Sequence, residues 1–267
     1  MMKQSIACIP LLNLILICSA SGQMIDGPNV KYGNEWIDYN KSYYKIPVTE
    51  DGIYKIAYQD LISAGMNPAT LVGNDFQIHE HGEEIPLMIS TNEHFSSSDF
   101  ILFYGKKNKG KIDKYLYELP SKQLNPEYSL FTDTLIYFLS LDPGKINNRF
   151  DTLENDLNIT LPFVEEYYWH EETLVNHSDH FKPTYDGTNK VTYSHLDVPE
   201  GFSSPMREKN DYVLPVTNFR NVGEKPILKV RLATSTSPHK TNISLNGDVI
   251  DIIYATGYTV TDQSVEI

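Results

Sequence analysis

Two histidines lie close enough together near the middle of the N-terminal half to suggest a metal site. His79 and His81 are two residues apart in an alternating segment, so on a β-strand they would share one face, with Glu83 as a possible third ligand. Zinc sites normally need three or four convergent ligands, and no neighbouring residue completes such a set. We therefore interpret this pair as facing the solvent.

A second group of possible ligands lies further along the chain and is the densest in the sequence. Its members are all histidines or acids, namely His170, Glu171, Glu172, His177, Asp179 and His180. The spacing differs from His-Glu-x-x-His, which places two imidazoles on one helical face. Zinc or calcium binding is one interpretation, and a polar loop is the one that we favour. The prediction is that the chain binds no metal and no other cofactor.

The remaining motifs of enzyme chemistry are missing from the sequence. It contains no Gly-x-Ser-x-Gly elbow, no phosphate-binding Gly-Lys-Ser/Thr loop and no dinucleotide-binding glycine pattern. Both cysteines, Cys8 and Cys18, lie in an N-terminal stretch that has the features of an export signal. Removal of that stretch would leave no thiol for a disulfide, a metal site or a nucleophile. This chain by itself therefore has no recognisable catalytic set.

The export signal is predicted over residues 1–22. Lys3 supplies the positive charge, residues 6–18 are largely apolar, and small residues lead to cleavage between Gly22 and Gln23. The apolar run is shorter than the roughly 20 residues that span a bilayer, so we expect no transmembrane segment after removal of the signal. A lipid anchor on Cys18 is the alternative, although Ile17 stands where a small residue is expected. The predicted location is the periplasm or the cell surface.

The charge of the chain argues against nucleic acid as a partner. Its formal net charge at pH 7 is -13, and an acidic surface of that size repels phosphate backbones. The one basic cluster is the lysine-rich stretch 106–111, which has no interleaved aromatic residues. We interpret this stretch as a solvated hairpin tip.

The elements that would position these residues are predicted to be mainly β-strands, because the chain is rich in Tyr, Phe, Ile, Val and Thr, with Gly and Pro between the runs. Residues 44–48 and 53–56 read as a hairpin, residues 58–64 as a short helix, and residues 76–81 with 85–89 as a second hairpin. Residues 99–104 and 134–141 are apolar without alternation, which predicts strands at the centre of a core.

The composition divides the chain into an N-terminal β-rich domain with one short helix over residues 23–145, a linker over 146–160 and a β-sandwich over 161–267. In the sandwich, strands at 227–234 and 240–245 precede an Asn246-Gly247 turn. The sequence stops inside what reads as another strand, so we expect an incomplete sandwich at the front of a longer polypeptide.

Three consecutive aromatic residues, Tyr167, Tyr168 and Trp169, offer a possible ligand-stacking surface in the second domain. Their rings could stack on sugars, which would make this domain a secreted carbohydrate-binding module. In an alternating strand, however, such residues usually bury one face in the core. We favour burial and keep sugar binding as the alternative.

Several ordered landmarks resemble one family. The stretch 44–56 with Tyr58, Leu61 and Gly65, the strand 99–105, and Asn125 followed by Tyr128-Ser129 and residues 134–139 are similar to the opening of PorU-like sortases of the type IX secretion system. These are gingipain-type cysteine peptidases. The stretch 162–169 and the Asn246-Gly247 turn fit the β-domain that precedes their peptidase domain.

The resemblance implies a non-catalytic front region of an exported sortase-like protein. Its partners would be the downstream peptidase domain of the same polypeptide, outer-membrane secretion components or cargo proteins. The family's nucleophilic cysteine and its partner histidine lie in an α/β domain that no part of this sequence matches, so no catalytic residue is carried over.

Overall fold

The computed structural model describes residues 24–26, 29–31, 33–154, 163–164, 168–182, 195–196, 198, 200–214 and 223–267. The predicted signal and its cleavage point between Gly22 and Gln23 lie outside these ranges. Within them the chain is mainly β, with several antiparallel sheets and one α-helix, which confirms the predicted fold class. No helix in this part of the chain is long and apolar enough to cross a membrane.

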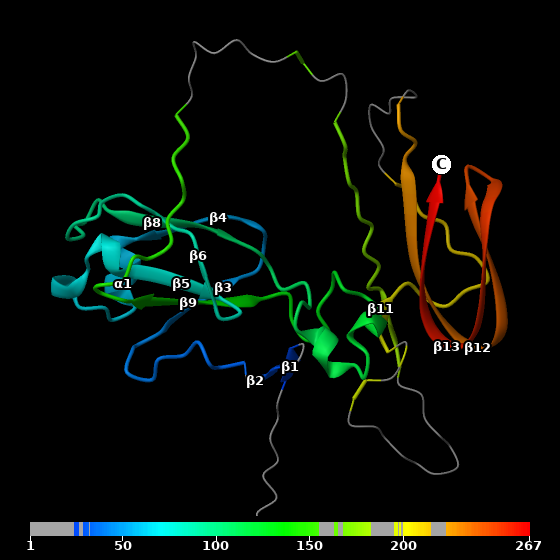
Figure 1. Cartoon of the computed structure of the whole chain (residues 1–267), viewed down its shortest axis with the longest axis horizontal. Coiled ribbons are helices and arrows are strands. Elements are labelled where there is room, and N and C mark those ends of the chain that lie inside the picture. The colour runs from blue at the N-terminus through cyan, green and yellow to red at the C-terminus, as the bar shows by residue number, and fades with distance from the viewer. Residues whose placement is uncertain are drawn as a thin grey trace, which may run out of the picture.

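Two antiparallel sheets form the N-terminal unit, residues 44–150 (Figure 1). The first sheet has the order β3-β9-β5-β6, with strands Tyr44–Val48, Leu135–Leu141, Phe76–Glu80 and Glu83–Ile85. The second has the order β4-β8-β7, with strands Gly52–Ala57, Phe100–Gly105 and Met88–Ile89. Strands β8 and β9 are thus central, as their continuous apolar character predicted.

The core of this unit comprises side chains from both sheets and from helix α1, Tyr58–Ser63. Phe103 of β8 and Tyr137 of β9 are fully buried, with ring centroids 5.4 Å apart. Leu61 is the buried residue of α1. The start of this helix is fixed by the Ala57 backbone N–H, which donates to the Asp60 carboxylate at 2.8 Å. Full burial of each such side chain stabilises the fold by about 1.5–3 kcal/mol.

One predicted strand pairing is wrong, and a second is right only in part. β3 and β4 follow one another, but β3 pairs with β9 and β4 pairs with β8, so the chain crosses from one sheet to the other between them. The predicted pairing of residues 76–81 with 85–89 is confirmed where β5 pairs with β6, with Ile78 opposite Ile85. The predicted strand 85–89 is divided at Pro86, however, and its second part, β7, lies in the other sheet. Alternation indicates which face of a strand is buried, but it does not identify the strand's neighbour.

A small β1–β2 pair, Met24–Asp26 with Asn29–Lys31, precedes this unit. At its other end, the N-terminal unit extends beyond the predicted boundary. The predicted linker begins at residue 146, yet the Phe150 N–H donates to the Leu87 carbonyl at 3.0 Å. Arg149 donates to the carbonyls of Phe76 and Gly73, each at 3.1 Å. The exposed connection therefore begins at Asp151.

A long antiparallel hairpin dominates the C-terminal part of the chain. β12, Ile227–Leu245, and β13, Asp248–Glu266, meet at the predicted turn, where Asn246 and Gly247 have φ values of 51° and 100°. The two strands predicted before this turn are one strand with an irregular register between Thr236 and His239. We name this element the C-terminal hairpin.

The C-terminal hairpin bends back on itself, so that its two halves face each other (Figure 1). Gln263 and Asp251 of β13, twelve residues apart, join across the fold with an Nε2–Oδ2 distance of 2.6 Å. Ile243, Ile253 and Val260 of the hairpin are buried. A separate pair, β10 (Asp179–Phe181) with β11 (Gly201–Ser203), lies beside it.

Candidate interaction site

The N-terminal unit meets the C-terminal hairpin at the connection between β8 and β9, residues 106–134. We name this connection the β8–β9 loop. It contains two 3-10 turns, Asp113–Leu116 and Pro120–Lys122. Figure 1 shows these green turns between the sheets of the N-terminal unit and the C-terminal hairpin. The lysines of the stretch 106–111 are exposed, as predicted, but the stretch is the start of this loop and not a hairpin tip, because β8 and β9 lie in different sheets. Its backbone is fixed at Lys107, whose N–H donates to Asp51 Oδ1 at 2.8 Å.

Polar side chains fill much of the inside of the β8–β9 loop, beside the buried Tyr117 and Leu124. The buried Asp113 carboxylate accepts hydrogen bonds from Ser129 Oγ at 3.0 Å and from the Leu130 N–H at 2.8 Å. Asn108 donates to Ser129 Oγ at 3.1 Å, and buried Gln123 donates to the Gly110 carbonyl at 3.1 Å. A buried network with its hydrogen bonds satisfied holds a loop in one conformation.

The fold of this loop requires a glycine at position 110. Its φ is +80°, and a Cβ there would lie 3.0 Å from Asp113 Oδ2 and 3.1 Å from the Ser129 Cα. Both the backbone conformation and the close approach of the 128–129 backbone disfavour a side chain here. Gly110 thus allows the two ends of the loop to touch.

Arg231 of β12 fastens the C-terminal hairpin to this loop. Its guanidinium donates to the carbonyls of Ser121, Gln123 and Leu124 at 2.8, 2.7 and 3.2 Å. Its Nη1 also donates to Asp262 on β13 and lies 2.8 Å from both carboxylate oxygens. One side chain therefore joins both strands of the hairpin to three carbonyls of the loop.

Other contacts join the β8–β9 loop to the β10–β11 region. The Tyr117 hydroxyl donates to the Glu200 carbonyl at 2.6 Å, and burial raises the pKa of this phenol to about 12. The Leu196 N–H donates to the Leu116 carbonyl at 2.8 Å. Asn125 Nδ2 donates to the Asn176 carbonyl at 3.0 Å. The loop is thus the structural junction of the described chain.

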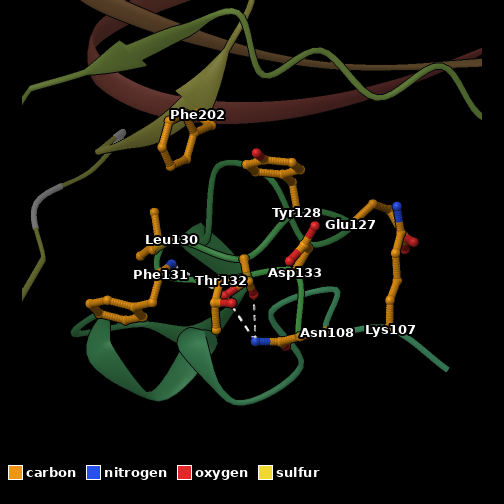
Figure 2. Close-up of a pocket in the computed structure, with 10 residues that line it drawn as sticks. Lys107, Asn108, Glu127, Tyr128, Leu130, Phe131, Thr132, Asp133 and Phe202 are labelled. Carbon is orange, nitrogen blue, oxygen red and sulfur yellow. Dashed lines mark hydrogen bonds between the residues drawn. The ribbon is translucent and has the colours of Figure 1, made fainter. Parts of the chain in front are cut away.

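A pocket of about 350 Å³ opens at this junction. Figure 2 shows Tyr128 and Phe202 on one side and Asn108 on the other, with Phe131 and Lys107 at the margins. The Tyr128 ring is already stacked on His177, with centroids 4.3 Å apart. Asn108 is occupied as well, because it donates to Ser129 and Thr132. Two of the side chains that line the pocket are therefore already engaged, Tyr128 with the 168–182 segment and Asn108 within the loop.

The first histidine pair does not face the solvent together, so that interpretation is wrong. His79 is 9% exposed and stacks on Trp36, with ring centroids 5.1 Å apart. Burial lowers its pKa below the ordinary value, and its Nδ1 has no hydrogen-bond partner among the described residues. His81 lies beyond the end of β5, in a turn with φ 49°. The two imidazoles therefore do not share a strand face.

The second group of possible ligands is also dispersed. His177 stacks on Tyr128, and His180 packs edge-on against Phe202 with centroids 4.9 Å apart. His170 Nε2 lies 3.2 Å from Glu172 Oε2, and both side chains are exposed. Among the described residues, no three His, Cys, Asp or Glu side chains are close enough to hold a metal ion.

Of the three aromatic residues proposed for stacking, Tyr167 lies outside the described residues. Tyr168 and Trp169 are 82% and 61% exposed and belong to an irregular segment. The favoured expectation that they alternate into a core is therefore wrong for these two. Phe163 and Val164, on the same segment, are 100% and 93% exposed. We name Phe163, Val164, Tyr168 and Trp169 the exposed apolar group.

Sequence reasoning missed the residues that build the junction. Asp113, Gln123 and Asn108 are types that usually lie at the surface, and nothing in their spacing indicated a buried network. Arg231 alternates with apolar neighbours, which predicted only that it faces away from them. Comparison of the chain with family models, with curated proteins and with solved structures found no match.

Proposed function

We propose that this chain is the non-catalytic docking region of an exported, type IX secretion sortase-like protein. It would bind the peptidase domain of the same polypeptide, an outer-membrane secretion component or a cargo protein. The sequence landmarks support the family, and the absence of a recognised catalytic motif supports a binding role. The periplasm or the cell surface is the corresponding location.

The exposed apolar group is the observation that carries this proposal. Phe163 and Val164 are 100% and 93% exposed, and Tyr168 is 82% exposed. Burial of a large apolar side chain contributes about 1.5–3 kcal/mol, so leaving several of them in water on one segment has a cost that a partner would remove. Large apolar side chains exposed close together in the sequence suggest an interaction site.

The β8–β9 loop supports this role because it gives the segment a fixed base. Residues 176–182 follow the exposed apolar group and are held through Asn125, through the stacked pair Tyr128–His177 and through the edge contact of His180 with Phe202. A segment held at its base can present apolar side chains to a partner with a smaller loss of entropy on binding.

A binding measurement tests the proposal. The chain without its signal and the polypeptide encoded directly after Ile267 are expressed separately, and their affinity is measured by calorimetry. Val164→Asp places a charge in the exposed apolar group and is expected to weaken binding at least about tenfold, because an apolar contact then loses about 1.4 kcal/mol or more. Ile146→Asp is the matched control, since Ile146 is 97% exposed but lies outside the group.

Two results would contradict the proposal. The first is equal weakening by Val164→Asp and Ile146→Asp, which would separate binding from the exposed apolar group. The second is peptide cleavage by the purified chain itself, abolished by replacing one of its own residues. A stop codon directly after Ile267 would exclude the peptidase-domain partner and the sortase assignment, while an in-frame α/β segment with a His and a Cys would support both.

A secreted carbohydrate-binding module is the second candidate, favoured by the exposure of Tyr168 and Trp169 at 82% and 61%. Sugar rings stack on the faces of aromatic side chains, so this binding would use Tyr168 and Trp169 and would not need Val164. Retardation in a polysaccharide affinity gel that is lost in Trp169→Ala and retained in Val164→Asp would favour this candidate. The opposite pattern in the calorimetric assay would favour protein docking.

A further inference from the structure

The two strands of the C-terminal hairpin carry charges of opposite sign. The Lys, Arg, Asp and Glu residues of β12 are all basic, namely Lys229, Arg231 and Lys240. Those of β13 are all acidic, namely Asp248, Asp251, Asp262 and Glu266. The separation is complete over both strands, so one long edge of the hairpin is positive and the other is negative.

Neither edge pairs with another described strand, and the Val260 carbonyl of β13 accepts a hydrogen bond from Lys122 Nζ at 3.4 Å. β12 and β13 form a two-stranded sheet and pair only with each other. The outward N–H and C=O groups of each strand therefore make no ladder with another described strand. Open edges of this length are sites for strand addition, and proteins usually shorten or cover them.

Within the hairpin, a basic residue of β12 already pairs with an acidic residue of β13. Arg231 and Asp262 are directly opposite in the register, and Arg231 Nη1 lies 2.8 Å from both Asp262 carboxylate oxygens. A β13 edge placed beside a β12 edge would repeat this kind of cross-strand pairing. Two β12 edges would instead oppose lysines, and two β13 edges would oppose carboxylates, which is unfavourable.

We infer that the chain associates with further copies of itself through these edges, with β12 of one copy beside β13 of the next. Charge complementarity selects this occupant, because the same molecule carries both the positive and the negative edge. Exposed apolar residues would be covered at the same time, since Val249, Tyr254 and Tyr258 of β13 are 55%, 72% and 48% exposed. This inference stands apart from the docking role of the exposed apolar group.

Such a contact joins two different edges, so it is head-to-tail and does not close after two copies. Each end of an assembly still carries one free edge, positive or negative. The mass should therefore rise continuously with concentration and fall with added salt, which screens charges. A contact between identical edges would instead stop at a dimer.

Sedimentation of the signal-free chain across a wide concentration range tests the inference. The wild-type chain is expected to show a continuous series of oligomers. Lys229→Glu/Lys240→Glu makes the β12 edge acidic on balance, and Asp248→Lys/Glu266→Lys removes the net charge of the β13 edge. Each double variant alone is expected to self-associate at least about tenfold more weakly. Arg231 and Asp262 stay unchanged in both because they hold the hairpin on the β8–β9 loop.

Mixing the two double variants gives the sharpest readout. The first keeps its acidic β13 edge and the second keeps its basic β12 edge, so together they should form a one-to-one complex that grows no further. Lys45→Glu/Lys209→Glu changes two exposed lysines outside the hairpin and should leave the series unchanged. Circular dichroism confirms that each variant is folded.

Three results would overturn the inference. These are a wild-type chain that stays monomeric throughout, a wild-type chain that stops at a dimer, and loss of association in the Lys45→Glu/Lys209→Glu control. Failure of the two double variants to form the one-to-one complex would also exclude pairing of the opposite edges. None of these results depends on binding by the exposed apolar group.

Discussion

His79 shows how one buried side chain can make the stability of this chain depend on pH. The ring is stacked on Trp36 and lies near Glu84, Lys145, Lys41 and Asp142. Burial is the largest influence and lowers its pKa below the ordinary value of 6.5, although Glu84 acts in the opposite direction. The folded state therefore favours the neutral imidazole.

The resulting prediction concerns acid. Below about pH 6.5 the unfolded chain takes up a proton at His79 more readily than the folded chain, so the stability contribution present above that pH is lost as the pH falls. His79→Phe keeps an aromatic ring against Trp36 and should flatten this slope. Urea unfolding midpoints at about pH 7.5 and about pH 5.5 measure the difference.

His81 is the internal comparison for that experiment. Burial also lowers its pKa, so it contributes a slope of the same sign. The His79→Phe variant should consequently retain part of the pH dependence. An unchanged slope in His79→Phe would show that this ring does not govern the acid response.

Gly110 gives a second prediction at the scale of a single residue. Gly110→Ala forces a side chain into φ +80° and against Asp113 and Ser129. We expect a loss of about 1–2 kcal/mol in the free energy of unfolding. Gly52→Ala is the control, because a Cβ at Gly52 meets nothing within 4 Å. Denaturant titration should place Gly52→Ala within about 0.5 kcal/mol of wild type, and equal losses would contradict the role of Gly110.

At the scale of elements, Arg231 couples the hairpin to the β8–β9 loop, and its removal is predicted to release the hairpin. Arg231→Met takes donors away from three carbonyls and from Asp262. Hydrogen bonds to charged groups are worth about 1.5–3 kcal/mol, so protection of β12 and β13 amides against hydrogen exchange should fall by about that amount. Lys229→Met, on the same strand, is the control, and β8 and β9 amides should keep their protection in both variants.

Which elements could be predicted depended on what each sequence pattern reports. Continuous apolar runs located β8 and β9 at the centre, and Asn246-Gly247 gave the hairpin turn, because both signals are local. The partners of β3 and β4 were not predictable, since pairing is decided by distant strands. The β8–β9 loop was hidden for a different reason. Its interior combines Asp113, Gln123 and Ser129 with only two buried hydrophobic residues, Tyr117 and Leu124, which are too few to give a periodic apolar pattern.

At the scale of the whole molecule, the junction predicts how the chain behaves when it is cut. Residues 151–154 are exposed and irregular, which makes them an early protease site. Cleavage by a glutamate-specific protease at Glu154 should leave two fragments that elute together, because the β8–β9 loop still contacts Arg231, Glu200 and Asn176.

The same digestion of Arg231→Met should yield fragments that separate more readily on gel filtration. Separation of the wild-type fragments under mild conditions would mean that the junction does not hold the two parts without the covalent connection. If the two fragments elute together in both wild type and Arg231→Met, the Tyr117 and Asn125 contacts are sufficient to hold the fragments together.

The position of the β8–β9 loop in the chain also implies an order of assembly. Its two ends are the central strands of two different sheets, so the loop takes its shape only after β9 has joined the first sheet and β8 the second. Arg231 lies 107 residues beyond Leu124, the loop residue to which it donates. In a chain that emerges with its N-terminus first, the loop carbonyls that accept from Arg231 are therefore present well before Arg231 itself. We therefore expect the C-terminal hairpin to dock on an N-terminal unit that has already folded. Slow folding of the N-terminal unit would then also delay docking of the hairpin.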